Sequence, residues 1–195
     1  MRLKHARHLG EWMTLYKVFA AGRMAPAFVL AACLVFAAST ASVLGDTHLP
    51  PHSIPTGRVV LTVQGNIQLT NAYRQADFDI AMLMSIPSTQ IVTTTPWTEG
   101  SVLFEGVSMN TLLSHVASKG LEVEVTALND YTVRIPIEDF TKFNPIIAYK
   151  MNGKLMAVRD KGPLWLIYPL DDHEQLQSAK YRDRMVWQLR TITVN

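Results

Sequence analysis

The order of apolar and polar residues predicts a chain rich in β-strands beyond residue 57. Residues 121–127 are the clearest case, because Leu, Val and Ala alternate with Glu and Thr as in a strand with one buried face. Asn152-Gly153 lies between two apolar runs and is typical of a two-residue hairpin turn. Strands are predicted at residues 58–63, 90–95, 121–127, 131–135, 145–151, 154–158, 164–168 and 186–194.

Three other segments show helical spacing. Residues 76–86 repeat apolar positions near the helical period, and Pro87 ends the pattern. Ser108 is placed to cap a helix with an apolar face, which Gly120 would end. Residues 174–184 predict a polar helix. Since helices and strands are interspersed and hairpins imply antiparallel pairing, the predicted fold class is α+β, with a β-rich mixed sheet and short helices.

The N-terminal part predicts export. Residues 24–45 contain no charged residue, basic residues precede this run, and small residues follow its apolar core. This is the order of a secretory signal peptide, here cleaved after Ala41 or Gly45. Two alternatives stay open, because the run is long enough for an uncleaved membrane anchor and Cys33 lies in a sequence that resembles a bacterial lipoprotein box. Each alternative predicts a periplasmic or otherwise exported protein.

Charge and prolines divide the chain into three parts. Residues 1–45 are the predicted signal peptide or N-terminal anchor, residues 46–57 a Pro-rich linker, and residues 58–195 the folded domain. The formal charge of +2 arises in the leader, because residues 1–45 carry five Lys or Arg and one acid. The remaining 150 residues carry 13 basic and 15 acidic residues, a net charge of −2. Nucleic-acid binding by the domain therefore has no electrostatic support.

Several classes of active site are absent from the sequence of the domain. The only cysteine is Cys33, so the exported domain has no disulfide, thiolate ligand or thiol nucleophile. It contains no Gly-rich phosphate loop and no Gly-x-Ser-x-Gly motif. The histidines beyond residue 45 are scattered, at positions 48, 52, 115 and 173, and they predict no metal site.

Two short segments carry candidate binding chemistry. Arg159 and Lys161 come directly before Gly162 and an aromatic-rich strand, so the cations could attract an anion beside an aromatic wall. Residues 129–131, Asn-Asp-Tyr, offer hydrogen-bond acceptors and a ring. Both segments have a second interpretation as solvated turns, because their composition is also that of turns.

Several segments, in their order along the chain, resemble the molybdopterin-binding domain of the sulfite oxidase family. The resemblance covers roughly residues 58–194 and is closest to the short, exported, stand-alone versions of that domain. It implies a mixed α+β fold of the sulfite oxidase type. The segments are residues 104–107 (Phe-Glu-Gly-Val) with Leu112-Leu113, 129–131 (Asn-Asp-Tyr), 135–136 (Ile-Pro), the strand 145–149, 162–163 (Gly-Pro) with 166–169 (Leu-Ile-Tyr-Pro), and 187–192 (Trp-Gln-Leu-Arg-Thr-Ile).

The chain differs from this family in the loop that corresponds to the metal-binding loop. The resemblance implies that enzymes of the family bind molybdenum through one cysteine thiolate, in the loop before the segment matching residues 104–107. Here that loop, residues 92–97, reads Val-Thr-Thr-Thr-Pro-Trp, and a Thr hydroxyl is a poor replacement for a soft thiolate. Family enzymes also cradle the pterin phosphate with His and several Arg, for which Arg134, Arg159 and Lys161 are candidate remnants. The resemblance implies the fold without the chemistry.

We therefore expect an exported, non-catalytic module that binds a small anionic or aromatic ligand, or a partner such as a membrane sensor. The alternative is a periplasmic molybdopterin-dependent oxidoreductase with an atypical metal site and a redox partner, and a third candidate is a purely structural or assembly protein. If the protein is a non-catalytic module, we expect no cofactor. If it is the oxidoreductase, we expect molybdopterin. No catalytic or metal-ligating residue is assigned. The predicted ligand-binding residues are Thr94, Thr95, Trp97, Asn129, Asp130, Tyr131, Arg159, Lys161 and Gly162.

Overall fold

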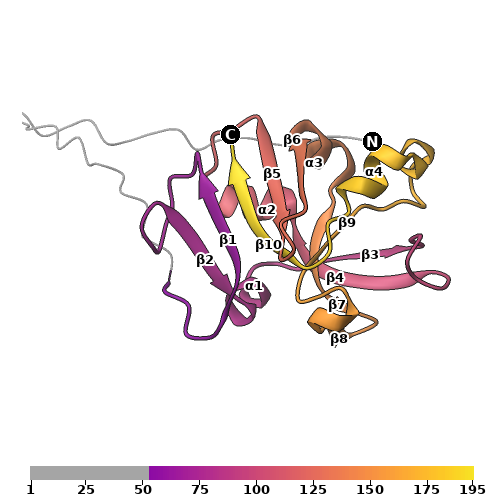
Figure 1. Cartoon of the computed structure of the whole chain (residues 1–195), viewed down its shortest axis with the longest axis horizontal. Coiled ribbons are helices and arrows are strands. Elements are labelled where there is room, and N and C mark those ends of the chain that lie inside the picture. Colours follow the sequence, from indigo (N-terminus) through magenta and orange to yellow (C-terminus); the bar gives the residue numbers. More distant parts are fainter. Residues whose placement is uncertain (1–52) are drawn as a thin grey trace, which may run out of the picture. The chain divides into compact units, whose positions relative to one another are not determined.

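The computed structural model describes residues 53–195, which fold into two β-sheets and several short helices (Figure 1). This architecture confirms the α+β, β-rich class. The expected signal peptide at residues 1–45 lies outside the described residues, as does most of the expected linker at residues 46–57. No helix within residues 53–195 is long and apolar enough to cross a bilayer.

The first sheet has the C-terminal strand at its centre. Its strands are β1 (Val59–Gly65), β2 (Gln75–Asp79), β5 (Glu122–Ala127), β6 (Thr132–Pro136) and β10 (Leu189–Val194). Their order in space is β2-β1-β10-β5-β6, and Figure 1 shows β10 between β1 and β5. β1 and β10 are parallel and the other neighbours are antiparallel. The last strand therefore joins two hairpins that are distant in sequence.

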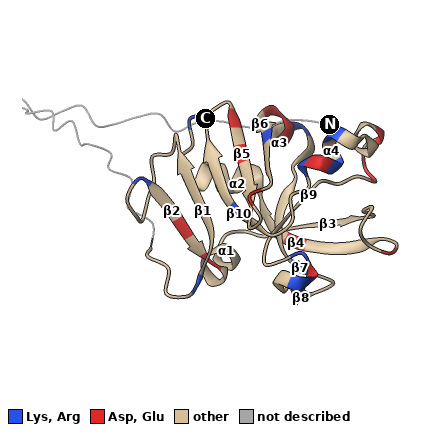
Figure 2. Ribbon diagram, in the orientation of Figure 1, with Lys and Arg blue, Asp and Glu red and all other residues tan. Residues whose placement is uncertain are grey.

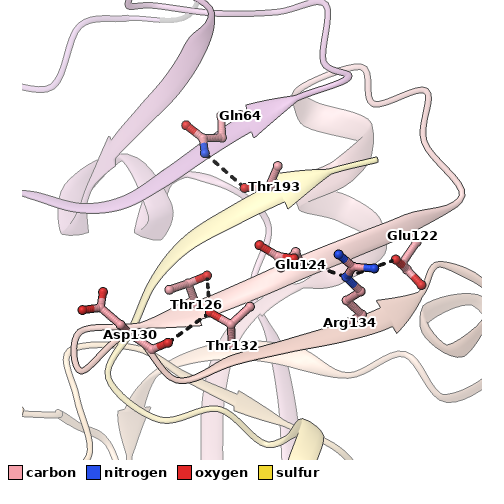
Figure 3. Close-up of polar contacts among 8 residues, drawn as sticks. All are labelled: Gln64, Glu122, Glu124, Thr126, Asp130, Thr132, Arg134 and Thr193. Atoms are coloured by element: carbon pink, nitrogen blue, oxygen red, sulfur yellow. Dashed lines mark hydrogen bonds and ion pairs between the residues drawn. The ribbon is translucent and has the colours of Figure 1, made fainter.

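One face of this sheet is polar and the other is part of the core. On the polar face, the Gln64 side chain donates to the Thr193 hydroxyl (3.1 Å), and the Arg134 guanidinium lies 3.3 Å from the Glu124 carboxylate (Figure 3). On the opposite face Val123 and Val125 are fully buried. This arrangement confirms the predicted alternation over residues 122–127, since successive strand residues point to opposite faces. The prediction is wrong for Leu121, which lies before β5 and is 87% exposed.

The second sheet is antiparallel and carries the buried rings of Phe104, Tyr149 and Trp165. Its strands are β3 (Thr89–Thr93), β4 (Val102–Ser108), β7 (Ile146–Met151), β8 (Lys154–Leu155) and β9 (Trp165–Ile167). The order is β3-β4-β7-β8, and β9 pairs with β7. Asn152 (φ 49°) and Gly153 (φ 77°) both have positive φ between β7 and β8, which confirms the predicted hairpin turn.

The helices are short and begin at identifiable caps. They are α1 (Ile80–Ser85), α2 (Met109–His115), α3 (Glu138–Phe143) and α4 (Ala179–Arg184), with 3-10 turns η1 (Val158–Asp160) and η2 (Glu174–Gln177). Ser108 accepts a hydrogen bond from the Thr111 backbone N–H (3.1 Å), which confirms the predicted cap. Asp79 caps α1, and the backbone N–H of Met82, the largest cause, together with that of Gly57 holds the Asp79 pKa below its ordinary value.

The helix predicted at residues 76–86 is wrong in its first half. Residues 75–79 form β2, in which Ala76 and Phe78 are buried while Gln75 and Asp77 are less buried. This two-residue period pairs with β1, and the pairing outweighs the weak helical spacing that includes Phe78. The helix begins only at Ile80.

Three other predicted boundaries are also wrong. α2 ends at His115 rather than running to Gly120, because Ala117 has a left-handed backbone (φ 49°). The strand predicted at 154–158 ends at Leu155, before η1. The helix predicted at 174–184 divides at Ser178, whose backbone is extended (φ −74°, ψ 156°). β4 and α3 were missed as elements.

Candidate functional site

A cavity of about 250 Å³ lies where both sheets contribute loops. The loop between β3 and β4 comes from the second sheet, the turn between β5 and β6 from the first, and the segment from α4 toward β10 completes the wall. Its apolar lining consists of Trp97, Ala127, Tyr131, Met185, Val186 and Trp187. Its polar lining consists of Asn129, Arg182 and Asp183.

Two tryptophans of the wall rest on a third that is fully buried. The rings of Trp97 and Trp187 meet edge to face, with centroids 5.1 Å apart. Trp165 lies 6.0 Å from Trp97 and 6.4 Å from Trp187, and its indole N–H donates to the Met185 carbonyl (3.1 Å). Because the buried Trp165 indole packs against the rings of both Trp97 and Trp187, it supports the aromatic wall from the interior.

Two hydrogen bonds position Tyr131, the third ring of the cavity wall. The Tyr131 N–H donates to the Asn129 side-chain oxygen (3.2 Å), and the Tyr131 hydroxyl donates to the Asp183 carbonyl (3.0 Å). This second bond joins the β5–β6 turn to α4. Burial, and secondarily the Asp183 carboxylate, raises the pKa of Tyr131 above its ordinary value, so the phenol stays protonated and remains a donor at neutral pH.

Two residues of opposite charge line the cavity. The Arg182 guanidinium donates to the Gln177 carbonyl (3.0 Å) and forms no ion pair with any residue in 53–195. The Asp183 carboxylate forms neither an ion pair nor a hydrogen bond with the described part of the chain. Figure 2 shows that α4 carries residues of both signs. The cavity therefore has one basic and one acidic residue in its lining, beside its rings.

A buried ion pair fixes α4 beneath these groups. Arg184 pairs with Asp139 of α3, and both side chains are less than a tenth exposed. The Tyr168 hydroxyl also approaches the Asp139 carboxylate (3.4 Å), and burial raises the pKa of Tyr168. Because charges in the interior need close partners, this cluster constrains how α4 sits on α3.

Three of the nine residues proposed from the sequence line the cavity: Trp97, Asn129 and Tyr131. The others do not line it. Lys161 lies behind the wall, with its ammonium 5.2 Å from the Trp187 ring and 5.8 Å from the Trp165 ring. It therefore contacts the aromatic wall from outside the cavity.

The remaining five candidates have local contacts of their own. Thr94 binds the Asp171 carboxylate, and Thr95 hydrogen-bonds Thr98 (2.9 Å) and the Trp97 N–H (3.2 Å). Asp130 pairs with Arg190 (3.1 Å), and Arg159, with 88% of its side chain exposed, pairs with Asp160 (3.6 Å). Gly162 is buried, and a Cβ there would collide with the Met156 carbonyl.

Sequence reasoning missed the segment that supplies most of the polar wall. Arg182 and Asp183 were assigned to a polar helix, and Trp187 to a strand, so no binding role was inferred. A signal was present, since Trp187 begins the last segment of the family resemblance. Within residues 53–195, no group of three or more His, Cys, Asp or Glu side chains is placed to hold a metal ion.

Comparisons with known proteins agree with this fold. Residues 60–185 match the family model described as oxidoreductase molybdopterin binding domain. A crystal structure of the sulfane dehydrogenase SoxCD from Paracoccus pantotrophus is similar, with a TM-score of 0.52 and 15% sequence identity. The similarity covers 69% of this chain and 37% of the SoxCD chain, so this chain spans well under half of that protein. No curated protein matches the chain.

The residues at the cavity do not fit a molybdenum centre of the thiolate type. The loop before β4 offers hydroxyls and no sulfur, and hydroxyls are hard donors. The Thr93 hydroxyl already accepts from the Asp171 N–H (3.2 Å), and the Thr95 hydroxyl is engaged within its own loop. The threonine hydroxyls of this loop are therefore poor ligands for molybdenum, and they already form hydrogen bonds within the protein.

Proposed function

We propose that this chain, which belongs to the oxidoreductase molybdopterin binding domain family, is an exported, non-catalytic module that binds a small ligand. The observation that carries the proposal is the cavity walled by Trp97, Tyr131 and Trp187. The resemblance to the family implies that the loop containing Trp97 corresponds to the metal-binding loop of its enzymes. A fold can be inherited while its site changes function. Here the loop holds an aromatic ring and satisfied hydroxyls in place of a thiolate.

The chemistry of the wall favours a flat ligand. Tyr and Trp provide large, rigid apolar surfaces that bury a ring with little loss of side-chain entropy, and a polar tip that orients it. The few polar groups at the edge, from Asn129, Arg182 and Asp183, are the pattern of a small-molecule site. A partner such as a membrane sensor would then recognise the ligand-bound form of the module.

The ligand-binding proposal is tested by isothermal titration of the protein with indole, benzoate, adenine and L-phenylalanine. At least one should give a saturable change, and Trp97→Ala should weaken it about tenfold or more, because one face of the site is removed. Tyr73→Ala, which removes a ring that is 88% exposed and outside the cavity, is the matched control and should change nothing. Binding that is insensitive to Trp97→Ala would contradict the proposal.

The second candidate is a molybdopterin-dependent oxidoreductase with an atypical metal site, which the family match favours. Protein produced in a molybdenum-replete host distinguishes the two. We expect no stoichiometric molybdenum by elemental analysis, because the loop before β4 has no soft donor. One molybdenum per chain, together with turnover by a redox partner, would establish the enzyme instead.

Export is part of the proposal and is supported by the uncharged run at residues 24–45. The mature chain should begin near Ser42 or Asp46. N-terminal sequencing of protein from separated cell fractions measures this directly. Full-length protein recovered from the cytoplasm would contradict it, and retention in the membrane fraction would identify the anchor or the lipoprotein.

A further inference from the structure

We propose that the cavity recognises a zwitterionic amino acid with an aromatic side chain. The ring would lie against Trp97, Tyr131 and Trp187, the carboxylate on Arg182 and the ammonium on Asp183. This inference rests on the proposed ligand-binding function and names the class of ligand.

The charges of the cavity carry the inference. Arg182 and Asp183 are consecutive residues that both line the wall, and neither is ion-paired within residues 53–195. Four other arginines of the described chain have carboxylate partners: Arg134 with Glu124, Arg159 with Asp160, Arg184 with Asp139 and Arg190 with Asp130. Arg58 and Arg74 have no ion pair within residues 53–195 either, but of these three arginines only Arg182 lines the cavity. A purely anionic ligand would meet the repulsion of Asp183, and a purely cationic one that of Arg182. A ligand with both charges satisfies both side chains.

The hydrogen-bonding capacity of these groups fits the two ends of an amino acid. A guanidinium presents a planar fork that matches a carboxylate, and one Arg182 nitrogen is already held by the Gln177 carbonyl. A carboxylate accepts up to four hydrogen bonds and matches an ammonium, which donates three. The Asn129 amide oxygen is engaged by the Tyr131 N–H, while its NH₂ group has no partner within the described residues and is a further donor to the ligand carboxylate.

The two charged residues lie on a constrained backbone. The Asp183 carbonyl receives the Tyr131 hydroxyl, and Arg184, the next residue, is locked to Asp139 in the interior. The end of α4 is therefore held from both sides. Because the backbone that carries both residues is held, ligand binding would order the two side chains without the added entropy loss of ordering a loop.

The size and the aromatic wall limit the choice of ligand. The cavity volume of about 250 Å³ lies just below the roughly 300–1,000 Å³ typical of sites for drug-sized molecules, so one amino acid fits better than a peptide. The Lys161 ammonium already lies 5.2 Å from the Trp187 ring. Since that cation draws on the same ring quadrupole, Trp187 is less suited to a quaternary ammonium cage than to stacking on a ring.

Isothermal titration of the purified exported protein tests the assignment with matched compounds. The probes are L-phenylalanine, 3-phenylpropionate, which lacks the amine, phenethylamine, which lacks the carboxylate, and L-alanine, which lacks the ring. L-phenylalanine should bind, and each of the other three should bind about 10- to 100-fold more weakly, the range for loss of one charged hydrogen bond or of the ring.

Two charge-neutralising variants identify the side chains. Arg182→Gln should weaken L-phenylalanine about 10- to 100-fold and leave phenethylamine unchanged, while Asp183→Asn should weaken L-phenylalanine and leave 3-phenylpropionate unchanged or tighter. Asp183→Asn keeps the backbone carbonyl that holds Tyr131. Arg134→Gln removes an exposed guanidinium from the polar sheet face and is the matched control, with no effect on binding. Thermal melts of each variant verify folding, and Arg182→Lys, which keeps the charge, should bind with intermediate affinity.

Several results would overturn the assignment. Equal binding of L-phenylalanine and 3-phenylpropionate, or no effect of Arg182→Gln, would show that the cavity does not recognise a zwitterion. If adenine, indole or benzoate binds in a Trp97-dependent way and L-phenylalanine does not, the ligand class is wrong and the ligand-binding function stands. If no ring compound binds, both proposals fail.

Discussion

Replacing Arg184 with Met is expected to lower the free energy of unfolding by about 3–5 kcal/mol. Arg184 and Asp139 form an ion pair with side chains only 9% and 7% exposed. The substitution leaves the Asp139 carboxylate buried with only the Tyr168 hydroxyl at 3.4 Å, and an uncompensated interior charge is costly. Urea denaturation followed by far-UV circular dichroism measures the loss.

A double variant separates the charge effect from packing. Asp139→Leu with Arg184→Met removes both charges and should be less destabilising than Arg184→Met alone, because no isolated charge remains. The matched exposed variant is Arg134→Met, whose pair with Glu124 lies on the solvent-facing side of β5 and β6 and should cost at most about 1 kcal/mol. A loss below that value for Arg184→Met would mean that water reaches the pair.

Replacing Trp165 with Ala is expected to cost about 3–5 kcal/mol of stability, the range for truncating a large buried ring. Trp165 is fully buried and meets the Phe104 ring at a centroid distance of 5.5 Å. The substitution also removes the base on which Trp97 and Trp187 rest, so binding of ring compounds should be lost together with stability. Denaturation and fluorescence titration of the same samples measure the two effects.

The conservative change Trp165→Phe keeps a ring but loses the hydrogen bond to the Met185 carbonyl, and it should fall between wild type and Trp165→Ala in both measurements. Tyr73→Ala removes a ring that is 88% exposed and should change stability by less than about 0.5 kcal/mol. A Trp165→Ala protein that retains full affinity for ring compounds would show that Trp97 and Trp187 hold their positions independently.

The position of the cavity follows from the sheet topology. β10 runs parallel to β1 and antiparallel to β5, so the chain that leaves α4 must enter the centre of the first sheet beside the β5–β6 turn. On the way it passes β9, where the Leu166 N–H donates to the Val186 carbonyl (2.9 Å). This crossing brings Val186 and Trp187 against Trp97 of the other sheet. The two sheets thus share one aromatic wall.

Local patterns in the sequence determined the elements whose preferences agree with their environment. The alternation at residues 122–127, the Asn152-Gly153 turn and the Ser108 cap depend on neighbouring residues alone, and the structure confirms each. The family resemblance, carried by short ordered motifs, identified the fold. The absence of a cysteine beyond Cys33 predicts a changed metal site. Export, which concerns residues outside the described part, stays a prediction.

Tertiary structure decided the features that depend on contacts between residues far apart in the sequence. Pairing with β1 turned residues 75–79 into a strand although Phe78 fits helical spacing, because a paired, half-buried strand gains more than a short isolated helix. Arg159 and Arg182 have similar surroundings in the sequence, because each is followed by Asp, by a second cation and, a few residues later, by Trp. Only the fold separates them: Arg159 pairs with its neighbour in solvent, while the crossing of α4 toward β10 brings Arg182, Asp183 and Trp187 to the wall that Trp97 and Tyr131 begin. Contacts between residues some 50 to 90 positions apart depend on topology, and periodicity carries no information about them.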